Sequence, residues 1–184
     1  MDDLRAIQLL KKGDINGLEL LIERYQVKAI RVAFLITRDE AMAEDVVQET
    51  YLRIYRRIRS FDVSRPFEPY FLSCVTHTAI DAAERASRNV ILDEGEPEQI
   101  DHLLQKAVST ENLVEYNQLR EEIFSSLGRL SPRERAVIIQ RYYLEMSEKE
   151  MAAENRVAPG TVKWLLNSAR RRLRGLIGAE DEIE

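Results

Sequence analysis

The stretch that decides the fold is residues 147–174, which read SEKEMAAENRVAPGTVKWLLNSARRRLR. Ser147 and Glu150 form a capping box, which predicts the start of a short helix. A turn follows at 155–157, and Pro159 is typical of the first turn of the next, longer helix. Two helices joined by so short a turn predict a helix-turn-helix.

The second of these helices has two different faces. Its apolar residues recur at steps of four, three and four, which predicts a buried face of Val162, Leu166, Ala169 and Leu173. From the first helix we expect Met151 and Ala152 to point inward, with Val157 of the turn filling the joint. The predicted outer face consists of Thr161, Lys163, Trp164, Asn167, Ser168, Arg170 and Arg171.

This outer face suits the major groove of DNA, where the N-terminal residues of a recognition helix reach base edges. Lys163 and the basic run at 170–174 would meet phosphates, which gives affinity without sequence information. Asn167 can pair with adenine, and Trp164 could contact thymine methyl groups. The alternative is a solvated helix whose basic end is favoured by the helix dipole.

Composition excludes several classes of protein. The 184 residues are 32% charged and 45% hydrophobic, which does not suit a disordered or fibrous chain. No apolar run is long enough to span a membrane, and the acidic N-terminus does not suit a signal peptide. Cys74 is the single cysteine and there are two histidines, so we expect no disulfide framework, no metal site and no cofactor. The composition is that of a soluble, reduced, intracellular protein.

The overall charge of −5 hides an uneven distribution along the chain. The first 89 residues hold equal numbers of acidic and basic residues, whereas 90–118 hold seven acids and one lysine. Residues 119–179 hold twelve basic and seven acidic residues, before a final acidic run. We therefore predict an all-α chain of two small helical domains: a first domain at 1–89, an acidic linker at 90–112, a helix-turn-helix domain at 113–179 and an acidic tail at 180–184.

A second informative helix is predicted over 38–60, opened by a capping box that begins at Thr37. Its buried stripe is predicted to be Ala43, Val47, Tyr51, Ile54 and Ile58. Beside that stripe lies a second, mostly polar one, made of Asp45, Gln48, Glu49 and Leu52. Two interpretations remain open: a solvated face with a Glu49–Arg53 ion pair, or a face that binds another protein.

The end of the same helix is basic, and aromatic residues follow it. Arg53, Arg56, Arg57 and Arg59 precede Phe61, and a loop at 62–65 leads to Phe67, Tyr70 and Phe71 on a helix predicted over 66–88. Basic groups interleaved with aromatic rings can bind single-stranded nucleic acid, because the rings stack on unpaired bases. The same aromatics at helical spacing also suit a core, and for Phe71 we expect the core.

Taken together, these motifs resemble those of bacterial RNA polymerase sigma factors. Residues 43–53, AEDVVQETYLR, resemble the AEDVVQETFLR signature of that family. LSPRER at 130–135, GTVK at 160–163 and ARRRL at 169–173 resemble its −35-binding domain. The size and two-domain layout are similar to the extracytoplasmic-function (ECF, group IV) branch of the sigma-70 family.

The resemblance implies three sets of contacts. The first set would dock on the β′ clamp helices of core RNA polymerase, with the β subunit as a further partner: Asp45, Gln48, Glu49 and Leu52. The second set would hold the promoter −10 element: Arg56, Arg57, Phe61, Ser64, Arg65, Phe67, Tyr70, His77 and Arg85. The third set would read the −35 element: Pro159, Gly160, Thr161, Lys163, Trp164, Asn167, Ser168, Arg170 and Arg171.

The chain also departs from the family pattern at DNA-facing positions. Helix 66–89 has only two arginines against three acids, and VKWLLNSA at 162–169 replaces the frequent VKSRLHRA, with two basic residues fewer. We therefore expect an unusual promoter specificity and low DNA affinity of the free protein.

The expected function is a promoter-specificity subunit without catalysis of its own. The resemblance also implies control by an anti-sigma factor, which can hold this otherwise cytoplasmic protein near the membrane without membrane insertion. The alternative is a sigma-like mimic that titrates an anti-sigma factor without initiating transcription. A stand-alone helix-turn-helix repressor would leave the stripe at 45–52 unexplained, and no nucleophile–base pair or phosphate loop points to an enzyme.

Overall fold

The computed structural model describes residues 3–89 and 123–177. Within these ranges the chain is all-α, as predicted, and contains no strand. It divides into two compact units, residues 1–83 and 84–184. The predicted linker at 90–112 and the tail at 180–184 lie outside the described residues. No helix in the described ranges is long and apolar enough to cross a membrane.

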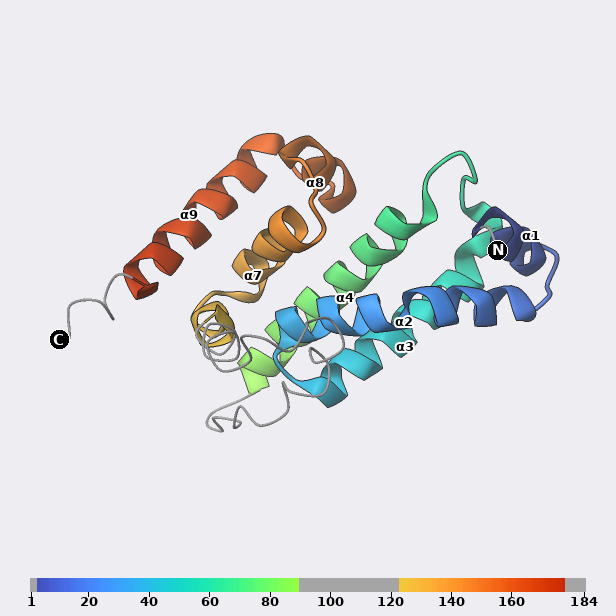
Figure 1. The fold of residues 1–184 in the computed structure, drawn as a ribbon, viewed down its shortest axis with the longest axis horizontal. Helices are drawn as coiled ribbons and strands as arrows, with labels where there is room; N and C mark the ends of the chain where they lie inside the picture. The colour runs from blue at the N-terminus through green and yellow to red at the C-terminus, as the bar shows by residue number, and fades with distance from the viewer. Residues whose placement is uncertain (1–2, 90–122, 178–184) are drawn as a thin grey trace, which may run out of the picture. The chain divides into compact units, whose positions relative to one another are not determined.

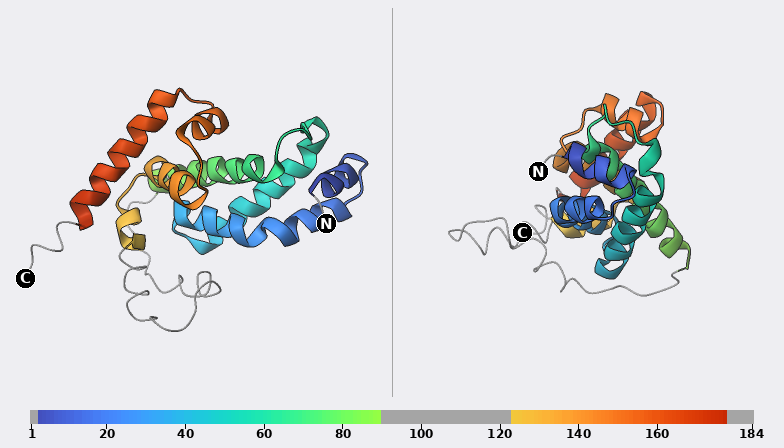
Figure 2. Two further views of the ribbon diagram at one scale, coloured as in Figure 1. Left: turned by 45° about the horizontal axis from the view of Figure 1, so that its top comes forward. Right: turned by 90° about the vertical axis from the view of Figure 1, so that its right-hand side faces the viewer.

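The first unit is built on a long antiparallel helix pair. Its elements are α1 (Asp3–Lys11), α2 (Asn16–Thr37), α3 (Glu40–Arg57), the 3₁₀ turn η1 (Ile58–Ser60) and α4 (Phe67–Asn89). α2 packs along α3, and α1 packs on α2 and also contacts η1 (Figures 1 and 2). Gly13, with φ at 88°, makes the tight turn between α1 and α2.

Apolar side chains of α2, α3 and α4 form the core of this unit. The predicted buried stripe of α3 is confirmed, and Val46 and Thr50 are buried with it. Phe71 of α4 is fully buried, as expected. Its ring lies 4.8 Å from that of Tyr51 in α3 and 5.9 Å from that of Tyr25 in α2, so one aromatic side chain joins three helices.

The start of α3 differs from the prediction. Thr37 is the last residue of α2, and its hydroxyl donates to the carbonyl of Ala33 at 3.0 Å. Arg38 turns the chain with φ at 63°, and the carboxylate of Asp39 accepts from the Met42 amide at 2.7 Å. The predicted capping box is therefore wrong, because Asp39 rather than Thr37 caps the helix.

The second unit contains the predicted helix-turn-helix. Residues 123–128 are helical, followed by α7 (Pro132–Ile138), the π turn η4 (Ile139–Tyr143), α8 (Glu148–Asn155) and α9 (Pro159–Ile177). A capping box opens α8 at Ser147, as predicted, and a second capping box opens α7 at Ser131. The apolar cluster that joins the three helices consists of Val137, Met151, Ala152, Val162 and Leu166.

The turn between α8 and α9 contains one correction and one feature that the sequence did not predict. Arg156 adopts a left-handed conformation with φ at 54°, and Val157 stays exposed instead of filling the joint. A pair of amides closes this region, because Gln140 Nε2 donates to Asn155 Oδ1 at 2.9 Å and Asn155 Nδ2 donates back to Gln140 Oε1 at 2.8 Å. Because Gln140 is buried, its amide needs a hydrogen-bond partner, and the pair connects η4 to the end of α8.

Candidate protein and nucleic-acid interfaces

The polar stripe of α3 forms a continuous exposed face. Asp45, Gln48, Glu49 and Leu52 are all exposed, and the side chain of Leu52 is 54% accessible. Glu49 Oε1 lies 3.0 Å from Arg53 Nη2, which confirms the predicted ion pair. An exposed leucine beside carboxylates and an amide gives this face both apolar and polar contacts to offer a partner.

A pocket of about 260 Å³ lies beside this face, between α2 and α3. Its apolar part comes from Ile22, Ile30, Val47 and Tyr51, and its polar part from Gln26, Glu44 and Gln48. Gln48 belongs to the pocket and to the exposed face at once. A side chain of a protein bound to the face could therefore enter the pocket next to Gln48.

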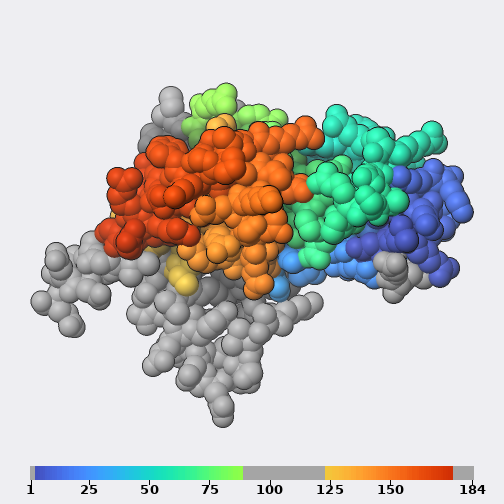
Figure 3. Space-filling model, turned by 90° about the horizontal axis from the view of Figure 1, so that it is seen from above, coloured from blue at the N-terminus to red at the C-terminus, as the bar shows by residue number. Residues whose placement is uncertain are grey.

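The loop after η1 is held in one shape by a short-range hydrogen-bond system. Asp62 Oδ1 accepts from the amide of Ser64 at 2.9 Å and from its hydroxyl at 2.8 Å, and the Arg65 amide donates to the Asp62 carbonyl at 3.1 Å. The two bonds from Ser64 lower the pKa of Asp62, and the charges of Arg65 and Lys11 lower it further. The loop is thus a preformed, exposed turn with a basic residue at its end. The teal-to-green part of the chain, to which it belongs, reaches the surface in the space-filling view (Figure 3).

The residues predicted to hold the −10 element divide by burial into three groups. Phe61 and Phe67 are buried, with accessibilities of 7% and 3%, and their ring centroids lie 5.7 Å apart. Both rings close the end of the core, and little of their surface is exposed. Tyr70 and His77 are half-buried. The remaining predicted residues are exposed: Arg56, Arg57, Ser64, Arg65 and Arg85.

The outer face of α9 is narrower than predicted. Ser168 is half-buried, and its hydroxyl donates to Glu134 Oε1 at 2.7 Å. Arg170 is also half-buried, and its Nε donates to the Tyr142 hydroxyl at 3.0 Å. Both side chains turn to the flank that faces α7 and η4. The exposed predicted residues are Pro159, Gly160, Thr161, Lys163, Asn167, Arg171 and Trp164, which is 65% accessible.

Glu134 forms a polar centre between α7 and α9 that the sequence did not reveal. Its side chain is 6% accessible, and it accepts from the amide and hydroxyl of Ser131 at 3.0 and 2.9 Å as well as from Ser168. Arg172 Nη1 lies 3.3 Å from its Oε2. Burial raises the pKa of Glu134, but the bonds from Ser168 and Ser131 and the charge of Arg172 outweigh burial, so the net pKa is lowered.

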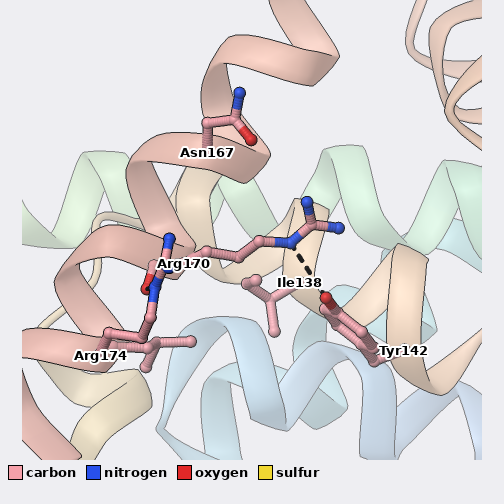
Figure 4. Close-up of a pocket in the computed structure, with 6 residues that line it drawn as sticks. Ile138, Tyr142, Asn167, Arg170 and Arg174 are labelled. Atoms are coloured by element: carbon pink, nitrogen blue, oxygen red, sulfur yellow. Dashed lines mark hydrogen bonds between the residues drawn. The ribbon is translucent and has the colours of Figure 1, made fainter. Parts of the chain in front are cut away.

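A larger pocket, of about 650 Å³, lies on the flank of α9. Its lining residues are Ile138, Tyr142, Asn167, Arg170, Leu173 and Arg174. Figure 4 shows Arg170 extending from α9 toward Tyr142, where its guanidinium carbon also lies 5.8 Å from the centre of the tyrosine ring. An apolar floor with arginines beside it suits a partner helix with apolar and acidic side chains.

Comparison with known families assigns each unit to a class. Residues 21–89 match the family described as Sigma-70 region 2, and residues 120–173 match Sigma-70, region 4. The exposed face of α3 and the loop after η1 fall within the first match, and the helix-turn-helix as far as residue 173 falls within the second. The fold and its surfaces thus define a sigma factor of the sigma-70 class.

Similar curated proteins specify the branch of this class. The chain is 37% identical over 149 residues to the ECF RNA polymerase sigma factor SigL of Mycobacterium tuberculosis, covering 78% of this chain and 79% of SigL. It is 27% identical over 176 residues to SigW of Bacillus subtilis, covering 92% and 94%. The chain belongs to the ECF RNA polymerase sigma factors, a family of non-catalytic initiation factors that bind core RNA polymerase and promoter DNA. These matches give no support to the mimic alternative.

Solved structures share the fold. CnrH, in a complex with the cytosolic domain of CnrY, has a TM-score of 0.65 at 22% identity, with 96% of this chain and 97% of CnrH covered. The sigma factor RpoE of Bartonella quintana, in a complex with the anti-sigma factor NepR, has a TM-score of 0.63 at 19% identity, with 87% and 96% covered.

Proposed function

We propose that this chain is a promoter-specificity subunit that docks on core RNA polymerase through α3, holds the −10 element with the loop after η1 and reads the −35 element with α9. The observation that carries the proposal is the exposed face of α3, Asp45, Gln48, Glu49 and Leu52, which lies within the signature at 43–53. In this proposal 1–89 and 113–179 act as the two domains, 90–112 as the linker and 180–184 as the tail.

The α3 face suits the β′ clamp helices because it combines carboxylates with exposed apolar surface. The internal ion pair of this face involves Glu49 and Arg53, whereas the exposed side chains of Asp45 and Gln48 lie outside it and their polar groups are available to a partner. The pocket beside Gln48 would receive a side chain of the clamp. Residues whose truncation costs more than about 1 kcal/mol are a minority of an interface and cluster near its centre, where we place Asp45 and Gln48.

The test is a double substitution, Asp45→Ala with Gln48→Ala. We expect the Kd for core polymerase to rise by roughly tenfold or more while the fold is retained, since both side chains are exposed. Fluorescence anisotropy of the labelled protein titrated with core enzyme measures this. The matched control is Gln8→Ala with Glu19→Ala, an exposed amide and acid on other helices. An affinity equal to that of the control would remove α3 from the interface.

For the −10 element, we assign the exposed basic and hydroxyl groups around the loop, Arg56, Arg57, Ser64 and Arg65, with Tyr70, His77 and Arg85 as further contacts. A flipped base costs a few kcal/mol to extrude, and contacts from a preformed loop offset that cost. Since Phe61 and Phe67 are buried, their part in this site is to support the loop from below.

For the −35 element, we assign Lys163 and Arg171 to phosphates and Asn167 and Trp164 to base edges. Lys163→Ala should weaken binding on all sequences and flatten the salt dependence by about one unit of log–log slope. Asn167→Ala should instead change base preference at one position, worth about 1–3 kcal/mol of discrimination. Binding to a randomised −35 library at several salt concentrations measures both. Equal losses on every sequence for both variants would contradict the readout assignment.

Two further contacts complete the proposal. The pocket on the flank of α9 would receive the polymerase β subunit, since it combines apolar residues with two arginines and shares only Asn167 with the side chains assigned to DNA. An anti-sigma factor would hold the chain inactive in the cytoplasm or near the membrane by covering these faces. The support for such a factor is that two solved structures with this fold are complexes, CnrH with the cytosolic domain of CnrY and RpoE with the anti-sigma factor NepR.

A further inference from the structure

Helix α1 lies before the region 2 match, which begins at residue 21, yet it is bonded to the loop after η1. Lys11 is the last residue of α1, and its Nζ donates to the carbonyl of Phe61 at 2.6 Å across fifty positions of sequence. α1 also contacts η1 directly. The loop is thus tied to an element that the family match does not include.

The position of Lys11 is fixed because α1 is packed tightly on α2. A Cβ at Gly17 of α2 would lie 2.3 Å from the carbonyl oxygen of Ala6, so only glycine allows this approach. Asp3 accepts from Arg24 and, at 2.5 Å, from the hydroxyl of Tyr25. Bonds at its start and close packing along its length leave α1 little freedom to move the Lys11 ammonium.

Lys11 acts on the residue where the loop begins. The ring of Phe61 is held by Tyr70 at 4.8 Å, and its carbonyl is held by Lys11. The next residue, Asp62, is the one whose carboxylate shapes the loop through Ser64. Lys11 is therefore hydrogen-bonded to the backbone of Phe61 and lies close enough to Asp62 for its charge to favour the ionised carboxylate.

We infer that Lys11 is a positioning residue for the DNA-holding loop, so that α1 belongs to the −10 recognition apparatus. This inference rests on the proposed function of that loop. Lys11 does not touch DNA in this proposal. It holds the backbone at Phe61, where the chain leaves η1. The loop is therefore ordered before DNA binds, and Ser64 and Arg65 contact DNA without a further loss of conformational entropy. Preorganisation of this kind raises affinity by lowering the entropy lost on binding.

The experiment uses holoenzyme assembled from core polymerase and the full chain. The probe is a fluorescent single-stranded DNA selected by the wild-type holoenzyme from a random pool. Lys11→Met removes the donor but keeps an apolar stem, Lys11→Arg restores a donor, and Lys12→Met removes the neighbouring exposed lysine as the matched control. Ser64→Ala and Arg65→Ala test the loop itself. Probe affinity is measured at several salt concentrations, together with affinity for core enzyme.

We expect Lys11→Met to weaken the probe about five- to tenfold, with the salt dependence and core affinity unchanged, and Lys11→Arg to recover most of the loss. Lys12→Met should stay within about twofold of wild type. If the slope of log affinity against log salt concentration became shallower by about 0.7, Lys11 would be neutralising a phosphate directly. This result would overturn the positioning role. An unchanged affinity, or an equal loss of core binding, would overturn it as well.

The loop variants separate the two possible failures. If Ser64→Ala and Arg65→Ala weaken the probe but Lys11→Met does not, the inference fails and the proposed −10 site stands. If neither loop variant weakens the probe, the −10 assignment of the loop fails, and the role of Lys11 fails with it.

Discussion

Replacing Phe71 with alanine is expected to destabilise the first unit by about 3–5 kcal/mol. The side chain is fully buried, and its ring contacts those of Tyr25, Tyr51 and Phe67, the last at 5.7 Å in a stacked arrangement. Its removal leaves a cavity at the point where α2, α3 and α4 meet. Because well-packed helices relax only partly, the neighbouring rings cannot refill that space.

Chemical denaturation followed by circular dichroism measures this effect. Tyr55→Ala is a suitable control, since Tyr55 is an aromatic residue of α3 that is exposed, and we expect it to change stability by no more than about 0.5 kcal/mol. A loss below about 1 kcal/mol for Phe71→Ala would contradict the packing described. The variant should also lose polymerase and −10 binding together, because the α3 face and the loop are supported by the same core.

Glu134→Ala is expected to destabilise the second unit by about 2–4 kcal/mol. The change removes the acceptor for Ser131 and Ser168 and the ionic partner of Arg172, so α7 and α9 lose their polar connection. Thermal unfolding of the full chain followed by differential scanning calorimetry measures the loss. Glu150→Ala is the control, since Glu150 is exposed and its side chain accepts from the amide and hydroxyl of Ser147 within its own capping box.

The same residue predicts a pH dependence. The pKa of Glu134 in the folded unit lies below its ordinary value of 4.5. Its ionised form therefore stabilises the fold above about pH 4.5, and this contribution is lost as the pH falls through the lowered pKa. The stability of Glu134→Gln should accordingly fall less than that of the wild type when the pH drops below 4.5. Parallel acid profiles for both proteins would contradict the assignment.

Local patterns in the sequence predicted the elements that local chemistry controls. The capping boxes at Ser131 and Ser147 were predictable because cap and acceptor lie three residues apart. The buried stripe of α3 followed from helical periodicity, which places every third or fourth residue on one side. The helix-turn-helix was predictable from a capping box and helical periodicity together.

The site residues were less predictable where a neighbouring helix determines whether a side chain is exposed or buried. Periodicity placed Ser168 and Arg170 on the outer face of α9, but Glu134 and Tyr142 draw both to its flank, and these partners lie 34 and 28 positions away. Phe61 was assigned to the −10 site from the neighbouring basic residues and the family resemblance, although its burial depends on the approach of α1 and α4. Long-range contacts of this kind leave no signal within a short window of sequence.

The amide pair of Gln140 and Asn155 has a consequence for how this domain can change over evolution. Each amide both donates to and accepts from the other, and Gln140 is buried. A substitution of Asn155 leaves the buried donor and acceptor of Gln140 unpaired, and a substitution of Gln140 leaves those of the half-buried Asn155 unpaired, whereas an apolar residue at both positions leaves none. The two positions are therefore expected to drift as a linked pair among descendants of this gene, in step with each other and independently of the promoter sequences that α9 reads.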